Sequence, residues 1–422
     1  MKTLFLFGIF VLLLLLSVPA GYAIGISGIL SILLFSDMPI LSIGMYTLDG
    51  CDSFSLLAVP FFILAGNLMT TGGIAKRIVN FANACLGHIT GGLSIVTTAA
   101  CMFYAAISGS AFATTGAVGS FMMPAMEEKG YDKGFSGAIS AAAGSIGVII
   151  PPSIPFVLYG CAVGASVGSL FKAGLIPGIM MGIALMVVCY IESKKNGWRG
   201  TDRKSTAKEI WVAFKDSFWA LMMPVIILGG IYTGAFTPTE AAVISVVYCV
   251  IISVFIYKEM KWKELLEAFT STIQLCGVSL FMMGFCNTFS IYMTMAQIPQ
   301  AMTKAVMGIT SNPILLLLVI NIFLLIVGCF IDNIPATMIL SPILLPIVRE
   351  IGMSPIQFGV LLTMNLAIGF ITPPYGMNLY MAAMVGKMPI GTMIKPTLKF
   401  LAALLVVLML ITYVPWFSMA FV

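Results

Sequence analysis

Two pairs of adjacent prolines interrupt apolar segments of this chain and limit what those segments can become. The first pair lies in GSIGVIIPPSIPF (144–156), and the second lies in IGFITPP (368–374). A proline inside a helix removes a backbone N–H donor and clashes with the preceding turn, so each segment is expected to break into two helices. The irregular stretch between them needs partners for the carbonyl groups that lose their helical donors.

The apolar content of the chain places these breaks inside a membrane. Of 422 residues, 60% are hydrophobic and 9% are charged, and the mean hydropathy is +1.08. A soluble core cannot cover this much apolar surface, so the composition predicts an all-α polytopic membrane protein. Apolar segments lie near 22–36, 55–70, 90–107, 135–150, 153–170, 174–192, 217–236, 239–257, 265–295, 313–330, 356–372 and 397–420.

The basic residues indicate the topology of the chain. The polar segment from Glu192 to Asp216 holds seven of the 21 Lys and Arg residues, so the positive-inside rule makes it cytoplasmic. Because the basic residues fall between apolar segments, they do not indicate a nucleic-acid partner. The N-terminal segment 1–23 resembles a secretory signal, but apolar sequence continues after it, and we interpret it as a retained span with a cleaved signal as the alternative.

An internal duplication is the most informative feature of the sequence. Aligning segment 115–152 with segment 337–374 without gaps matches ten identical positions, among them Gly147 with Gly369 and the two proline pairs with each other. Counting spans from the cytoplasmic loop gives the two copies opposite orientations. The sequence therefore predicts two inverted repeats, each with a re-entrant hairpin and a discontinuous helix, which is the pattern of secondary transporters.

The broken helices are candidate cation sites. Irregular backbone at membrane depth is tolerated where it lies inside protein or lines a wet cavity, and a cation can replace the lost donors. Carbonyl oxygens near Gly147 to Ile150 and the hydroxyl of Ser108 are hard ligands that suit Na⁺. The alternative is a pair of proline kinks with a packing role only.

The starts of the two hairpins are candidate anion sites. ISGSAFATTGAVGS (107–120) and FIDNIPATMILS (330–341) are rich in small and hydroxyl residues. Helix N-termini there would offer free N–H groups to a carboxylate, and Ser110, Asn333 and Thr337 could add donors. Asp332 is a functional candidate because acids at membrane depth are rare, although it could instead cap its helix. Thr237, Pro238 and Glu240 form a capping box that needs no chemical role.

Enzymatic and ATP-driven alternatives lack their motifs. The chain has no HExxH and no GxxxxGK[ST] sequence, and His88 is its one histidine. Nine cysteines show no CxxC spacing, which argues against a zinc site or a disulfide framework. We therefore expect neither an enzyme nor a bound cofactor.

Five motifs in order resemble one family, the large membrane subunit of TRAP (tripartite ATP-independent periplasmic) transporters. They are FYAAISGSAFATTGAVGS, AAAGSIGVIIPPSIPFVLYG, GGIYTGAFTPTEAAVISVVY, CFIDNIPATMILSPILLPIV and NLAIGFITPPYGMNLYMAA. The resemblance implies an elevator-type, Na⁺-coupled importer in the bacterial inner membrane. It also implies a small four-helix membrane subunit and a soluble periplasmic protein that delivers an organic acid such as a C4-dicarboxylate or sialic acid. A self-sufficient Na⁺/carboxylate symporter of similar architecture is the alternative.

The resemblance also implies site residues. The first Na⁺ site would use Ser108, Gly147, Ile150 and Pro152, and the second would use Gly328, Gly369, Thr372 and Tyr375. Ala105 stands where family members often have serine, which puts one ligand of the first site in doubt. Family members also commonly have an aspartate shortly after SGSA, where this chain has Thr114 and Thr115, and we interpret this difference as a change in substrate preference. The substrate site would comprise Ser110, Asp332, Asn333, Thr337, Pro152 and Pro374.

These expectations divide the chain into five parts. Scaffold helices occupy 1–85 and 217–270, on either side of a first transport repeat (86–192) and a cytoplasmic loop (193–216). The first repeat would hold a hairpin near 108–130 and a broken helix near 135–170. The second repeat with the C-terminal helix occupies 271–422, with a hairpin near 330–352 and a broken helix near 356–387.

Overall fold

The computed structural model describes residues 2–200, 203–309, 312–373 and 375–422, and these residues form helices and no strands. The N-terminal part holds α1 (Lys2–Leu15), α2 (Ala20–Phe35), α3 (Ile40–Asp49), α4 (Ala58–Thr71) and α5 (Ile74–Leu86). The first repeat holds α6 (Gly92–Ser108), α7 (Ala111–Glu128), α8 (Lys133–Gly144), α9 (Ile154–Val163) and α10 (Val167–Asn196). Next come α11 (Ala207–Tyr232), α12 (Pro238–Val250), α13 (Trp262–Met295) and α14 (Ile298–Ile309). The second repeat holds α15 (Pro313–Phe330), α16 (Asn333–Glu350), α17 (Pro355–Gly369), α18 (Met377–Val385) and α19 (Gly391–Tyr413), before α20 (Trp416–Met419).

The helices confirm a polytopic membrane protein. Seven described segments are long and apolar enough to cross a membrane. They are Phe54–Thr71, which joins a 3₁₀ turn (Phe54–Leu57) to α4, together with Val167–Asn196, Ala207–Tyr232, Pro238–Ile256, Trp262–Met295, Pro313–Phe330 and Gly391–Tyr413.

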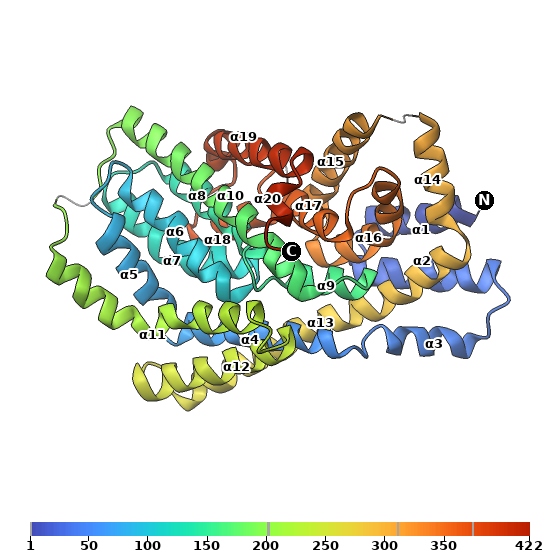
Figure 1. Ribbon diagram of the computed structural model, residues 1–422, viewed down its shortest axis with the longest axis horizontal. Coiled ribbons are helices and arrows are strands. Elements are labelled where there is room, and N and C mark those ends of the chain that lie inside the picture. Colours follow the sequence, from blue (N-terminus) through green and yellow to red (C-terminus); the bar gives the residue numbers. More distant parts are fainter. Residues whose placement is uncertain (1, 201–202, 310–311, 374) are drawn as a thin grey trace.

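The duplication read from the sequence reappears in the helix boundaries. When the two copies are aligned as in the sequence, α16 coincides with α7 at both ends, and α17 begins at the position equivalent to the start of α8. The turns after the hairpins also match, because Gly130 and Gly352 both adopt a left-handed conformation, with φ of 80° and 82°. The two hairpins reach the centre of the molecule from opposite sides, α6 and α7 from one and α15 and α16 from the other (Figure 1).

The predicted bounds of the hairpins and of the first broken helix were wrong in detail. Each hairpin has two arms, so it starts at α6 and α15 rather than at 108 and 330, which are its tips. The first broken helix ends at Val163, not at 170, because Gly164 adopts φ of 68° and Ser166 caps α10. The second broken helix, α17 and α18, lies within the expected limits of 356–387 to within one residue.

The predicted cytoplasmic loop, 193–216, was also too long. α10 continues to Asn196, where Gly197 ends it with φ of 72°, and α11 begins at Ala207. The start of α11 is fixed by a capping box in which the Thr206 hydroxyl accepts a hydrogen bond from Glu209 N, and the Glu209 carboxylate accepts one from Thr206 N. The predicted capping box of Thr237 and Glu240 is confirmed by the same pair of contacts.

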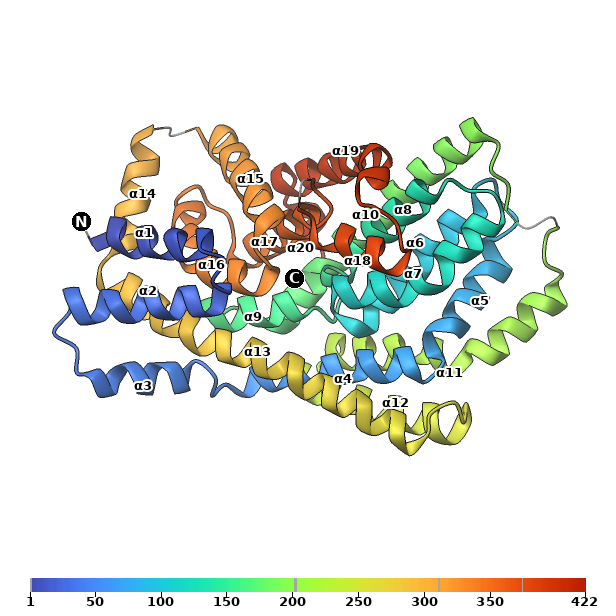
Figure 2. The same ribbon diagram turned by 180° about the vertical axis from the view of Figure 1, so that it is seen from behind.

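The boundary expected at residue 270 falls inside a single helix. α13 runs unbroken for 34 residues because it contains no proline, and its glycines do not interrupt it. It lies along α2, α3 and α4 (Figure 2). The Gly25 and Gly28 backbones of α2 approach Phe285 and Phe289 closely. α13 therefore belongs to a layer with α3, α4, α11 and α12, and the two repeats lie on one side of this layer (Figure 1).

Candidate functional site

One cavity of about 380 Å³ lies where the two repeats meet α4 and α13. Both hairpin tips and both helix breaks form one side of its wall. Helices α4 and α13 form the opposite side. Its polar side chains are those of Asn67, Ser108, Ser110 and Ser279, together with the pair Asp332 and Asn333 at one tip.

Four helix N-termini converge on this cavity. They belong to α7, α9, α16 and α18, whose first turns contribute Ala111, Ile154, Ile334 and Met377 to the wall. The first N–H groups of a helix have no acceptor within the helix, and the helix dipole makes this end positive. An anion in the cavity is therefore favoured without a basic side chain.

Short polar side chains cap the two hairpin tips. Ser110 accepts a hydrogen bond from Ala113 N at 3.3 Å, and Gly109 makes the turn before it with φ of 61°. Asp332 occupies the equivalent position and accepts from Asn333 N at 2.7 Å. The two tips differ in chemistry, because Asp332 is the one ionisable side chain among the described residues of the wall.

Oxygen atoms gather at the first helix break. The Thr114 hydroxyl donates to Ser110 O at 2.7 Å and lies 3.1 Å from the Ser108 hydroxyl. Gly147 lies against this group, since a Cβ placed on it would stand 2.5 Å from Thr114 Oγ1 and 2.6 Å from Ser110 O. Ser108 and Gly147, both predicted ion ligands, are thus brought together, with Thr114 as an additional hydroxyl.

The other predicted residues of the first ion site lie beside this cluster. Pro152 is buried, and its carbonyl oxygen faces Gly109, where a Cβ would stand 2.8 Å away. Ile150 donates its N–H to Ile146 O at 3.1 Å, and its side chain packs against Gly178 of α10. Ala105 is buried, and its carbonyl accepts from Gly109 N at 3.3 Å.

The second break brings two glycines into direct backbone contact. A Cβ on Gly369 would stand 2.6 Å from Gly328 Cα, so neither position accommodates a side chain without movement. The Thr372 hydroxyl donates to Ile368 O at 2.9 Å and keeps its lone pairs available. Tyr375 is 56% exposed, and its ring is tilted against the rings of Phe330 and Tyr380, which places it at the surface.

Three of the predicted substrate residues line the cavity, namely Ser110, Asp332 and Asn333. Thr337 is fully buried one turn deeper, where its hydroxyl donates to Asn333 Oδ1 at 2.8 Å. Pro152 is buried in the first break and does not reach the cavity wall. Pro374 lies outside the described residues.

Two polar wall residues were missed by the sequence reasoning. Asn67 and Ser279 reach the cavity from α4 and α13. Each is an isolated polar residue inside an apolar segment, a signal that could have selected them. Sequence alone could not select the face of each helix that meets the hairpins. Thr115 was also noted near the tip, but it donates to Ala111 O at 3.0 Å and packs against Gly144.

Comparison with known proteins places the chain in a family. Residues 7–417 match the model of the "Tripartite ATP-independent periplasmic transporter, DctM component". The chain is 42% identical over 399 residues to the C4-dicarboxylate TRAP transporter large permease protein DctM of Pseudomonas aeruginosa, covering 94% of this chain and 93% of that protein. It is 38% identical over 407 residues to the sialic acid TRAP transporter large permease protein SiaM of Vibrio cholerae, covering 96% and 95%.

Two further comparisons concern length and fold. The chain is 43% identical over 416 residues to the isethionate TRAP transporter permease protein DctMQ of Oleidesulfovibrio alaskensis, and this match covers 99% of the chain and 66% of that longer protein. The crystal structure of the Alcanivorax borkumensis YdaH transporter has the same fold, with a TM-score of 0.67, 14% identity, and coverage of 91% of this chain and 90% of that one. Together with the five motifs, these matches show that the chain belongs to the DctM component family, the large permeases of tripartite ATP-independent periplasmic transporters.

Proposed function

We propose that this permease carries an organic acid into the cell across the bacterial inner membrane, coupled to Na⁺ and supplied by a periplasmic binding protein. The observation that supports this most strongly is the single cavity on which four helix N-termini converge. Such a cavity suits a carboxylate or sulfonate. The relatives named for C4-dicarboxylate, sialic acid and isethionate all carry organic acids.

Sodium would bind at the two helix breaks. The first break offers the hydroxyls of Ser108 and Thr114 and the Ser110 carbonyl, a set of hard oxygens that fits Na⁺, with Gly147 providing space for close approach. The second break would use backbone oxygens near Gly328 and Gly369 with the free lone pairs of Thr372. Both groups adjoin the hairpin tips, so an ion at either break would stabilise the tips in a binding-competent arrangement.

Transport would follow from movement of the repeats against the scaffold. The cavity is walled by repeat elements on one side and by α4 and α13 on the other, so sliding the repeats would expose it to each side of the membrane in turn. Coupling requires that Na⁺ and the acid favour the same arrangement and so raise each other's affinity. A small four-helix subunit would associate with the permease in the bilayer.

Uptake by proteoliposomes tests this function. The vesicles would contain the chain and its small membrane subunit, and a panel of ¹⁴C-labelled acids would be offered with and without an inward Na⁺ gradient and the cognate binding protein. We expect uptake only when both are present. Uptake that needs Na⁺ but ignores the binding protein would favour the self-sufficient symporter, and uptake indifferent to Na⁺ would contradict the ion sites.

A further inference from the structure

The side of the cavity formed by α4 and α13, here called the scaffold side, is rich in hydrogen-bond acceptors. The Thr272 hydroxyl donates its proton to Ala268 O at 2.7 Å, so at 2.9 Å it must accept from the Asn67 side chain. This fixes the orientation of the Asn67 amide, with Nδ2 toward Thr272 and Oδ1 without a donor among the described residues. Asn67 therefore offers the cavity a carbonyl oxygen and at most one remaining N–H.

Ser279 adds a second acceptor on the same wall. Its hydroxyl donates to Leu275 O at 2.9 Å, one turn earlier in α13. While its proton is held there, the oxygen offers its lone pairs to a donor. Ser279 is 8% exposed and Asn67 is half-buried, and both line the cavity.

The hairpin side of the cavity is rich in donors. The first N–H groups of α7, at Ala111 and Phe112, have no acceptor within the helix. Asn333 is 2% exposed, and Thr337 donates to its Oδ1, which leaves Nδ2 without a partner among the described residues. This unpaired amide nitrogen is a further donor beside the cavity wall.

Asp332 decides where an anion can lie on the hairpin side. Its side chain caps α16 and, when ionised, would repel a second negative charge at that tip. The α7 tip, with Ser110 and the adjacent N–H groups, carries no such charge. The anionic group of a ligand is therefore favoured beside α7, and Asp332 becomes a third acceptor for other parts of the ligand.

We propose that the transported acid carries a hydrogen-bond donor, a hydroxyl or amide N–H, that is recognised by Asn67 Oδ1 and Ser279 Oγ. Its carboxylate or sulfonate would lie at the α7 tip. An unsubstituted dianion offers no donor to this wall and would leave the Asn67 and Ser279 oxygens unpaired beside it, which weakens binding. This inference rests on the proposed function, because it names the substrate class of the same cavity.

Binding of matched acid pairs tests the inference without the selectivity of a binding protein. The purified chain with its small subunit would be titrated in Na⁺ buffer with L-malate and succinate, glycolate and acetate, and isethionate and ethanesulfonate, followed by thermal shift and calorimetry. In pairs that bind, we expect the hydroxylated member to bind tighter by roughly tenfold, the value of one additional neutral hydrogen bond.

The outcomes separate the two proposals. Equal or tighter binding of the deoxy members would overturn the donor requirement while leaving organic-acid transport standing. Failure of all six acids to bind here, together with no uptake of any acid by proteoliposomes, would overturn both.

A pair of variants on α13 tests whether Ser279 recognises the hydrogen-bond donor of the acid. Ser279→Ala should weaken binding of the hydroxylated acid and leave the deoxy acid unchanged, which a general loss of structure would not do. Thr270→Ala is the matched control, since Thr270 makes the same hydrogen bond to the residue four earlier, Leu266 O at 2.9 Å, on an exposed part of α13 outside the cavity. Unchanged discrimination in Ser279→Ala would overturn the role of Ser279 in recognising the donor.

Discussion

At the scale of single residues, the tip of the first hairpin is built by close approach of backbone to hydroxyl groups. Gly147 has no side chain to separate the first break from Ser110 and Thr114. The same position in the second copy, Gly369, meets the backbone of Gly328 instead. The two breaks therefore share a glycine but differ in the oxygen atoms around it.

Substitution of this glycine tests its role. In Gly147→Ala, the added methyl group would stand 2.5 Å from Thr114 Oγ1, so the tip must move away from the break. We expect a loss of about 1–3 kcal/mol in stability, typical of overpacking, and loss of any stabilisation by Na⁺. Thermal unfolding of the purified protein, with NaCl and with choline chloride, measures both effects.

Gly229→Ala provides the control for that experiment. No atom lies within 4 Å of a Cβ at Gly229, which lies inside α11. Replacing a helical glycine by alanine there should stabilise the protein by about 0.5–1 kcal/mol and keep the Na⁺ response. A Na⁺ response in Gly147→Ala equal to that of Gly229→Ala would contradict the role of the first break in ion binding.

Residue patterns predicted local caps better than distant contacts. The Thr237 and Glu240 box was read from its spacing and is confirmed, whereas the identical spacing of Thr206 and Glu209 was overlooked inside a segment read as loop. The partnership of Ser108 with Thr114 and Gly147 depends on how the hairpin folds onto the break. No local sequence pattern predicts that these three residues come into contact.

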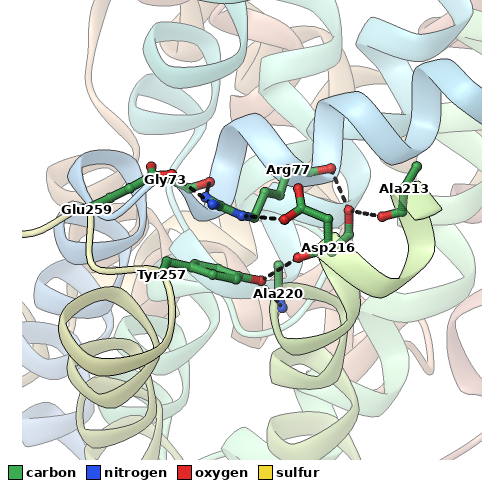
Figure 3. A network of polar contacts seen from close by, with 8 residues as sticks. Gly73, Arg77, Ala213, Asp216, Ala220, Tyr257 and Glu259 are labelled. Carbon is green, nitrogen blue, oxygen red and sulfur yellow. Dashed lines mark hydrogen bonds and ion pairs between the residues drawn. The ribbon is translucent and has the colours of Figure 1, made fainter.

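At the scale of helices, Arg77 joins three elements near the side expected to be cytoplasmic. Its guanidinium forms ion pairs with Glu259 at 2.8 Å and Asp216 at 3.3 Å, and it lies 3.8 Å from the centre of the Tyr257 ring (Figure 3). Asp216 belongs to α11, and the other two follow the π-helical end (Ile251–Ile256) of α12. One side chain of α5 thus links α5 to α11 and α12.

Loss of this link should weaken the scaffold. The Arg77 side chain is 15% exposed, while its acidic partners are 53% and 41% exposed, so solvent screening reduces the contribution of each pair. We expect Arg77→Gln to lower the unfolding free energy by about 1–2 kcal/mol. Lys263→Gln, which breaks an exposed pair with Glu267 at 3.9 Å, is the control and should have almost no effect. Equal thermal stability of the two variants would contradict the structural role of Arg77.

The positions of helices along the chain were easier to predict than which helices pack into the same structural unit. The apolar segments expected near 90–107 and 313–330 correspond to α6 and α15, yet the sequence did not reveal that these helices are the first arms of the hairpins. Likewise, a boundary was expected at 270, while α13 continues to Met295 and packs on α2 and α4. Grouping depends on packing partners far away in sequence.

At the scale of the whole molecule, the duplication was visible in sequence because both copies retain their turn and break residues. Cross-contacts between the copies could not be predicted. The Tyr159 hydroxyl of α9 donates to Pro355 O at 2.6 Å, and Asn378 of α18 donates to Ala141 O at 3.2 Å. These bonds interlock the repeats and support their movement as one body.

Contacts between repeat and scaffold should be specific to one transport state. The Tyr104 hydroxyl of α6 lies 2.5 Å from the Thr70 hydroxyl of α4, and it donates to Gly66 O at 3.2 Å. Next to them, a Cβ on Gly66 would stand 3.4 Å from the Cβ of Ser108. That separation is close to the distance found in disulfides, so the two positions can be cross-linked.

Cross-linking these positions tests most directly whether the repeats move against the scaffold. In a background without native cysteines, Gly66→Cys with Ser108→Cys would be oxidised in proteoliposomes, with each single variant as control. We expect oxidation to stop uptake in the double variant and reduction to restore it to the level of Ser108→Cys alone. Undiminished uptake with the cross-link complete would contradict movement of the first hairpin along α4.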